Sequence, residues 1–259
     1  MRDASRKLKK SSGKVGWAFP AGSAATNSIW FFHNFYWWSH GWSLVDYDKA
    51  SGKYVTGITP AQIAEGFRYY KSYFDEGLNP KNMLSITNWG DQALVEGMVR
   101  EDYAIISTPE FVMNRLEEAW TARNPGKDSP FYSTIHPKSS VTFRGGRMLG
   151  INPNSEHPEE SYKLIQYLVT WPIFEKYYPQ WPSQTSLIKK IDRGPRHAGY
   201  PAQLAKARSW GAYSNGPLAI PTMWNWVGRG AGSVFIGEKT PEEAAQELYD
   251  NLKKELAKQ

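Results

Sequence analysis

A four-residue helix start, Thr-Pro-x-Gln or Thr-Pro-x-Glu, occurs twice in the sequence, at 59–62 and at 240–243. In this pattern the threonine caps the helix, the proline suits its first turn, and the Gln or Glu side chain reaches back to the cap. The apolar residues that follow the first start at helical spacing are Ile63, Phe67, Tyr70 and Phe74. Those that follow the second start are Ala245, Leu248, Leu252 and Leu256. The two starts therefore predict an amphipathic helix over 59–77 and a second one at the C-terminus.

Short apolar runs alternate with these helices. Residues 103–107 and 148–151 have the length and composition of buried strands, and each run precedes a predicted helix. The second of these helices is expected to begin at Asn154 or Ser155 and to continue through Leu168. Strands that alternate with helices predict an α/β arrangement.

Composition limits the class of protein. With 41% apolar and 15% aromatic residues, the 259-residue chain can bury a substantial core as one large domain or two modest ones. The richest apolar run, 29–38, contains His33 and Asn34 and is too short for a membrane-spanning helix. The absence of cysteine excludes disulfides, Cys-ligated metals and Cys nucleophiles. Much of the positive excess lies at 2–14 and at 189–196, which we interpret as solubilising charge.

Four ordered segments in the first half of the chain carry a resemblance to a known family. They are the aromatic-dense stretch 17–41, the helix 59–77, the Trp-Gly-Asp-Gln-Ala-Leu run at 89–98, and 103–109. This order resembles the point at which family 1 extracellular solute-binding proteins of ABC importers enter their second lobe. Capture of a solute, rather than chemistry, is the task that the resemblance implies.

Later segments extend the resemblance over nearly the whole chain. Residues 143–151, followed by 154–170, are similar to the family's Gly-Gly, strand and helix stretch, and 240–248 is similar to its terminal helix. The resemblance implies the two-lobe α/β fold of type II periplasmic binding proteins. In this chain it covers mainly the C-terminal lobe plus a returning segment of the N-terminal lobe.

The resemblance also implies boundaries. Residues 1–137 would form the first part of the second lobe, 138–180 would visit the first lobe, and 181–259 would return to the second. Family members carry a signal sequence and a first lobe ahead of the point that matches Met1, so we expect this chain to be a fragment. The apolar residues of the visiting segment that would then lack partners include Met148, Leu149, Ile151, Ile165 and Leu168.

The implied function is capture of a carbohydrate or related polar solute, such as a polyol, in a cleft between the lobes. The implied partners are ABC permease subunits, and membrane association would occur only through the transporter. A periplasmic or extracellular location follows from the same resemblance. We expect no cofactor, no metal site and no enzymatic activity.

By the family pattern, the segments 24–30, 107–111, 145–147 and 223–226 approach the cleft. The ligand-binding candidates within them are Asn27, Trp30, Glu110, Gly146, Arg147, Trp224 and Asn225. Amides, carboxylates and guanidinium groups suit sugar hydroxyls, and indole rings suit the apolar faces of a sugar. An aromatic residue is common in the family near the position of Glu110, so this wall is expected to be more polar.

Five of the seven candidates also have a purely structural interpretation. Asn27 can cap the next helix, Glu110 can lie in the first turn after Pro109, and Arg147 can be a surface cation. The two indoles can simply be core. The net positive charge of the chain, together with Arg147, keeps an anionic solute among the candidate ligands.

Three other classes compete with capture. A glycoside hydrolase would need two acids across a scissile bond, whereas the acidic residues here lie in apparent turns and helix surfaces. Single-stranded nucleic acid would favour aromatics beside Lys and Arg clusters, but the aromatics here lie in apolar runs. A stand-alone interaction module remains an alternative.

Overall fold

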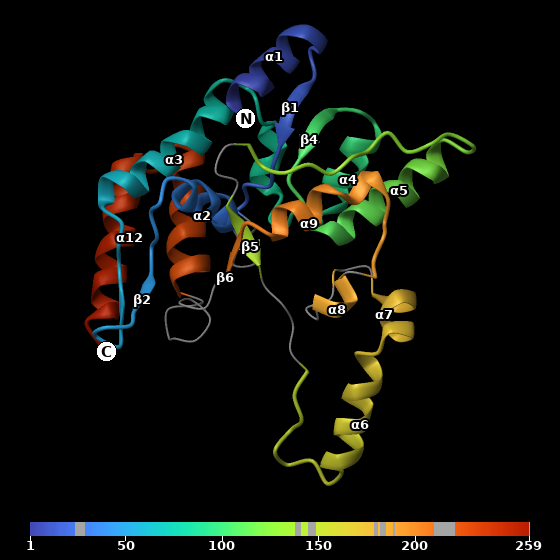
Figure 1. The fold of residues 1–259 in the computed structure, drawn as a ribbon. Coiled ribbons are helices and arrows are strands. Elements are labelled where there is room, and N and C mark those ends of the chain that lie inside the picture. The colour runs from blue at the N-terminus through green and yellow to red at the C-terminus, as the bar shows by residue number, and fades with distance from the viewer. Residues whose placement is uncertain are drawn as a thin grey trace.

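The computed structural model describes residues 1–23, 29–137, 141–144, 149–178, 181, 185–188, 190–209 and 221–258. At 29–30, 144, 185, 209 and 221–224 the description is limited to the backbone. Most of the elements form a compact body, and α6 and α7 extend away from it (Figure 1). We call residues 149–178 the arm.

Helices make up most of the described elements, and short strands lie between them. In the first half of the chain the elements are α1 (Arg2–Ser12), β1 (Val15–Ala18), α2 (Ile29–Ser39), β2 (Asp46–Asp48), β3 (Lys53–Val55), α3 (Pro60–Asp75), η1 (Lys81–Ser85), α4 (Gln92–Val99), β4 (Tyr103–Ile106) and α5 (Glu110–Arg123). In the second half they are β5 (Thr142–Arg144), α6 (Pro158–Leu168), α7 (Trp171–Tyr177), α8 (Thr185–Ile188), η2 (Pro195–His197), α9 (Gly199–Leu204), β6 (Ala207–Ser209), the π-helical η3 (Pro221–Gly228), α11 (Arg229–Phe235) and α12 (Pro241–Leu256).

Both predicted capping boxes are confirmed. The backbone N–H of Thr59 donates to Gln62 at 2.8 Å, and the N–H of Gln62 donates to the Thr59 hydroxyl at 3.3 Å. Thr240 and Glu243 repeat this exchange at 2.8 and 3.2 Å. The two helices that result, α3 and α12, pack against one another, and an ion pair joins Arg68 to the start of α12.

The central strands β1 and β4 are parallel, with Val15 opposite Tyr103 and Trp17 opposite Ile105. Because parallel strands end at the same edge, the residues after Ala18 and after Ile106 emerge side by side. We call this the carboxyl edge. The other described strands form an antiparallel hairpin, β2 with β3, and a short parallel pair, β5 with β6.

Aromatic rings make up much of the body's core. Phe19 lies 4.8 Å from Trp17 and 5.7 Å from Phe32, measured between ring centroids. Tyr70 is buried among them and donates its hydroxyl to the carbonyl of Phe32 at 2.6 Å. Most of these aromatics therefore serve packing, and only those at the edge of the core can contact a ligand.

Two predicted elements differ in the structure. The described part of the expected strand at 148–151 is not a strand, since none of the described strands lies beside it to pair with it. The helix expected from Asn154 or Ser155 begins at Pro158 instead. The Asn152 side chain accepts from the N–H of Asn154 at 2.9 Å and the Ser155 hydroxyl accepts from His157 at 3.2 Å, so these side chains satisfy a turn rather than a helix.

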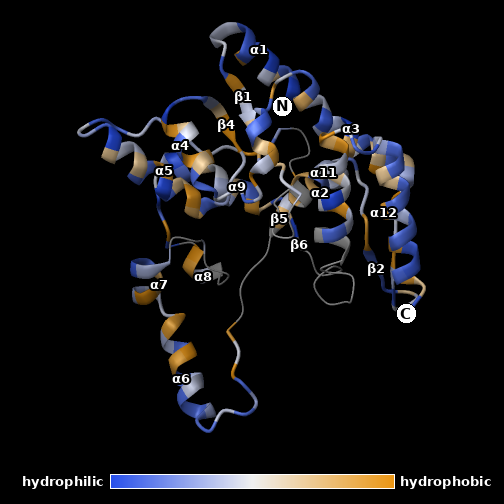
Figure 2. Ribbon diagram, turned by 180° about the vertical axis from the view of Figure 1, so that it is seen from behind, coloured by the Kyte–Doolittle hydropathy of each residue, from blue (hydrophilic) through white to orange (hydrophobic). Residues whose placement is uncertain are grey.

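The arm exposes apolar surface. Neither α6 nor α7 contains a buried residue, and Figure 2 shows hydrophobic positions along α6. The large exposed apolar residues of the arm are Leu149, Ile151, Tyr162, Leu164, Tyr167, Val169, Tyr177 and Tyr178. Of the residues expected to lack partners, Leu149 and Ile151 are exposed, Ile165 and Leu168 are half-buried, and Met148 lies outside the described residues. The division at 137 and 180 stays a prediction. No helix in the described ranges is both long and apolar enough to cross a bilayer.

Candidate functional site

The carboxyl edge is the candidate site, because ligands of open α/β sheets bind beyond the carboxyl ends of the strands. A hydrogen bond of 3.1 Å from the Trp17 indole to the Ser107 hydroxyl joins the two strand ends. Beyond them, 19–23 leads from β1 toward α2, and 107–109 leads from β4 into α5. Glu110, predicted to bind ligand, is the first residue of α5.

Glu110 is nearly buried, with 14% of its side chain exposed. The Arg193 guanidinium donates to its carboxylate at 3.2 Å, and the backbone N–H of Trp181 donates to the same group. Burial raises the pKa of Glu110 to about 7, because the neighbouring guanidinium and the two hydrogen bonds offset only part of the desolvation. The carboxyl group therefore changes charge near neutral pH.

Arg193 connects Glu110 to two further groups. Its Nη2 donates to the carbonyl of Tyr178 at 3.4 Å, just after α7, and its Cζ lies 5.2 Å from the centre of the Trp181 ring. We call Glu110, Arg193, Trp181 and Tyr178 the Arg193 cluster. It joins the first turn of α5 to the chain that returns from the arm.

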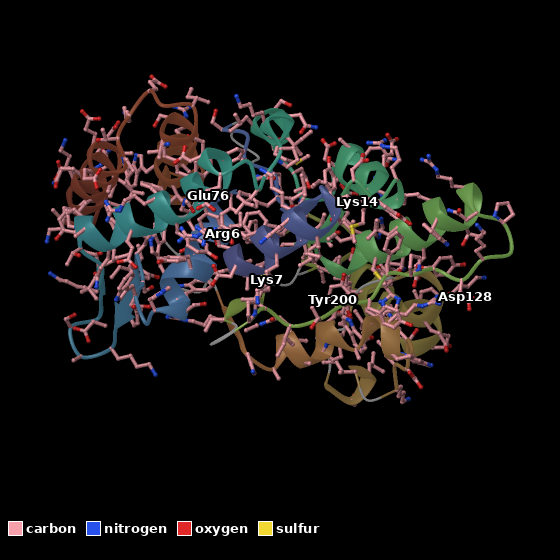
Figure 3. All side chains as sticks on the ribbon, turned by 90° about the horizontal axis from the view of Figure 1, so that it is seen from above. Arg6, Lys7, Lys14, Glu76, Asp128 and Tyr200 are labelled. Atoms are coloured by element: carbon pink, nitrogen blue, oxygen red, sulfur yellow. The ribbon has the colours of Figure 1, made fainter. Side chains whose placement is uncertain are left out.

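Tyr200 borders this cluster from α9, which lies against the apolar face of α5 (Figure 3). Burial raises the pKa of the Tyr200 phenol above its usual range, and the negative charges of Glu110 and Glu117 add to the effect. Further along α5, Glu117 lies 3.5 Å from the buried side chain of His197. The returning segment thus faces α5 with an arginine, a phenol and an imidazole.

A pocket of about 630 Å³ opens between η3, α11 and α12 and includes the predicted residue Asn225. Its polar lining includes Ser23, Asn225, Arg229, Ser233, Glu247 and Asn251. Through Ser23 and Ala21 the pocket reaches the chain that leaves β1. Among the described residues its lining shares none with the Arg193 cluster, so the pocket that includes Asn225 does not include Glu110.

The other predicted residues cannot be compared with the structure in the same way. Asn27, Gly146 and Arg147 lie outside the described residues. Trp30 is in the first turn of α2 and Trp224 is in η3, but the description there stops at the backbone. A ligand-binding role for these residues stays a prediction.

Sequence reasoning missed a half-buried aromatic group near this edge. Phe31 of α2 lies 4.2 Å from Trp89 and 5.4 Å from Phe143 of β5, measured between ring centroids. All three rings are partly exposed at the margin of the core. Their place in the sequence could have indicated them. Phe31 directly follows the segment 24–30, and Phe143 stands two residues before the segment 145–147, both of which were predicted to approach the cleft.

Arg193 and Trp181 were also missed. Arg193 belongs to the basic stretch 189–196, whose charge we interpreted as solubilising, and no local pattern links it to Glu110. Within the described ranges, no group of three or more His, Asp or Glu side chains is placed to hold a metal ion.

No protein-family model matches the chain, and no curated protein matches it at a significant level. Solved structures do match. One is an ABC-transporter solute-binding protein from Thermotoga lettingae TMO, solved with α-D-tagatose, with a TM-score of 0.73 and 18% identity. That match covers 98% of this chain and 63% of the solved one.

Two further matches are the sugar-binding protein MalE of Xanthomonas citri and a cyclo/maltodextrin-binding protein in complex with maltotetraose. The TM-scores are 0.67 and 0.58, with 17% and 16% identity. The matches cover 100% and 95% of this chain but only 62% and 60% of the solved chains. The chain thus has the α/β fold of periplasmic solute-binding proteins, as predicted, over less than two thirds of their length.

Proposed function

We propose that this chain is the substrate-binding part of an ABC importer of the family 1 type, and that its carboxyl edge forms one wall of a cleft for a carbohydrate or polyol. The observation that carries the proposal is the combination at this edge of partly exposed rings with a carboxylate and a guanidinium. Nearly the whole chain also matches sugar-binding proteins in fold.

The chemistry of the wall suits a sugar. Apolar faces of a pyranose or furanose pack on aromatic rings, and its hydroxyls need donors and acceptors. The rings of Phe31, Trp89 and Phe143 offer the first, and the Glu110–Arg193 pair offers both an acceptor and a donor. Trp30 and Trp224 extend the aromatic surface in this proposal, and Asn27, Gly146, Arg147 and Asn225 extend the polar one.

The proposed mechanism is a population shift. A solute that touches both lobes favours the closed form, which the permease subunits recognise at the outer face of the membrane. In this proposal 1–137 and 181–259 supply the second lobe and 138–180 belongs to the first. The chain acts by binding, in the periplasm or outside the cell, and carries out no reaction.

Affinity should be low for this chain alone. One wall supplies only part of the contacts, whereas association still costs translational and rotational freedom. We expect a dissociation constant on the order of 1 mM or weaker for the 259-residue chain. The neighbours were solved with tagatose and maltotetraose, which supports a panel that contains both single sugars and oligosaccharides.

The test measures binding and hydrolysis in the same samples. Intrinsic tryptophan fluorescence is followed during titration with tagatose, maltose, maltotetraose, myo-inositol and a sugar phosphate, with glycerol as the control for nonspecific effects. Saturable change at millimolar concentration for one sugar, with no new reducing ends, supports the proposal. Release of reducing ends would favour the hydrolase alternative, and no saturable change with any of the five ligands would contradict binding.

A further inference from the structure

The arm is held to the body by polar contacts at its end and not by a buried apolar interface. In the described residues, α6 and α7 bury no side chain, so no apolar core holds them against the body. The polar contacts of Arg193 lie where the arm returns. This residue reaches the last turn of the arm, through the Tyr178 carbonyl, and the first turn of α5, through Glu110.

We propose that Arg193 is a positioning residue of the candidate site, which fixes the arm relative to the carboxyl edge. Its planar guanidinium carries N–H donors on both terminal nitrogens, so it can donate to two acceptors at once. One face of the same group covers the Trp181 ring. A lysine has one ammonium group and cannot reproduce this geometry. The consequence for ligand binding rests on the proposed function, whereas the position of the arm does not.

The burial of the pair makes the arrangement sensitive to loss of either partner. The side chains of Glu110 and Arg193 are 14% and 20% exposed, so removal of one leaves the other charged group largely shielded from water. On the returning segment, the phenol of Tyr200 interacts electrostatically with Glu110, and His197 pairs with Glu117. Arg193 is therefore the cation that compensates Glu110 among the described residues.

Release of the cluster would free the arm. With Glu110 and the Tyr178 carbonyl no longer held together, the arm and α5 are joined only through the chain between them in the described residues. The body would keep its fold, because none of the four residues of the Arg193 cluster belongs to its buried apolar clusters. The expected effect is a change in where the arm stands, with the body unchanged.

The experiment measures the distance between the arm and α5 without any ligand. The chain contains no cysteine, so spin labels attach only at introduced sites. Lys163→Cys on α6 and Thr121→Cys on α5 are both exposed. Pulsed electron paramagnetic resonance gives the distance distribution in this background, in Arg193→Met, in Arg193→Lys and in Glu110→Gln.

Arg115→Met is the matched control. Arg115 also lies on α5 and donates to the Gly90 carbonyl and to Gln92, but it does not contact the arm. We expect a distribution about twofold wider in Arg193→Met and Glu110→Gln, partial widening in Arg193→Lys, and no change in Arg115→Met. Distributions of Arg193→Met and Glu110→Gln that superimpose on the background would overturn the proposal.

A second readout separates positioning from general destabilisation. The Glu110 carboxyl carbon, observed by nuclear magnetic resonance, reports its own titration. Loss of Arg193 must move that midpoint, because it removes both a cation and a group that shields Glu110 from water, whereas loss of Arg115 must leave it in place. Equal midpoints in Arg193→Met and in the background would contradict the role of Arg193. Neither readout uses a sugar, so failure of the proposed function leaves both interpretable.

Discussion

Nη1 of Arg193 lies 3.2 Å from Oε1 of Glu110, and this contact joins residues 83 positions apart in the sequence. It closes the chain between the end of β4 and the segment that returns from the arm. Burial of the pair, rather than their attraction, dominates the titration of the carboxyl group. This balance gives the protein a pH dependence that can be measured.

The pKa of Glu110 in the folded protein is about 7, above its ordinary value of 4.5. The folded state therefore binds more protons than the unfolded state between these values, and the unfolding free energy falls as pH rises through this window. For one such group the total fall is on the order of 3 kcal/mol. Urea unfolding at pH 5 and pH 8 should show this decrease in the wild type and a smaller one in Glu110→Gln.

Glu118→Gln is the control for that comparison, because Glu118 is exposed on the same helix. It should keep the wild-type difference between the two pH values. An equal difference in wild type and Glu110→Gln would show that Glu110 does not titrate in this range.

Loss of a helix cap should be measurable at either capping box. Thr59→Ala and Thr240→Ala each remove the hydroxyl that accepts a backbone N–H in the first turn, so each should lower the unfolding free energy by about 1 kcal/mol. Thr121→Ala, at an exposed position near the end of α5, should change it by less than about 0.5 kcal/mol. Urea unfolding of the three variants makes the comparison, and equal effects would argue against the caps.

Gly66 illustrates how packing can reverse a helix propensity. In an exposed helix interior, Gly→Ala stabilises by up to about 1 kcal/mol. A Cβ at Gly66 would instead overlap the indole of the fully buried Trp37. Gly66→Ala should therefore destabilise the fold by about 1–3 kcal/mol.

The matched control is Gly150→Ala, since a Cβ there meets no atom within 4 Å. Thermal unfolding of the two variants measures the contrast. A Gly66→Ala variant as stable as wild type would mean that Trp37 can move aside at little cost.

The apolar surface of the arm predicts that the protein binds a hydrophobic dye. Leu164 and Tyr167 are exposed on α6, so their replacement by lysine removes apolar surface without opening a cavity. Leu164→Lys with Tyr167→Lys should lower the fluorescence of bound anilinonaphthalene sulfonate and leave the unfolding midpoint unchanged. A lower midpoint would indicate that the arm packs against a partner surface in solution.

Local patterns predicted local structure well. Thr59 and Thr240 fix their helices through contacts three residues away, which a sequence displays directly. The strand expected at 148–151 failed because a strand needs a neighbour, and the described part of the chain provides none there.

The site was harder to predict because its residues also depend on partners that are remote in the sequence. Glu110 was predicted as a ligand-binding residue from its place in the family pattern. Its partner Arg193 is remote in the sequence and lies in a stretch that looks like ordinary surface charge. Trp89 was part of the family resemblance, yet only the fold brings its ring onto Phe31. Pairing across long sequence separations is set by packing, which residue patterns alone do not encode.

The most direct measurement of the central claim locates the bound sugar on the chain. Indole N–H signals are recorded by ¹⁵N nuclear magnetic resonance during titration with the sugar that gave the largest fluorescence change, and Trp89→Ala and Trp120→Ala assign two of them. Trp120 lies on α5 in a separate apolar cluster and serves as the remote control. The account predicts a saturable shift of the Trp89 signal and none for Trp120. A saturable shift of the Trp120 signal without one of the Trp89 signal would contradict a sugar-binding wall at the carboxyl edge.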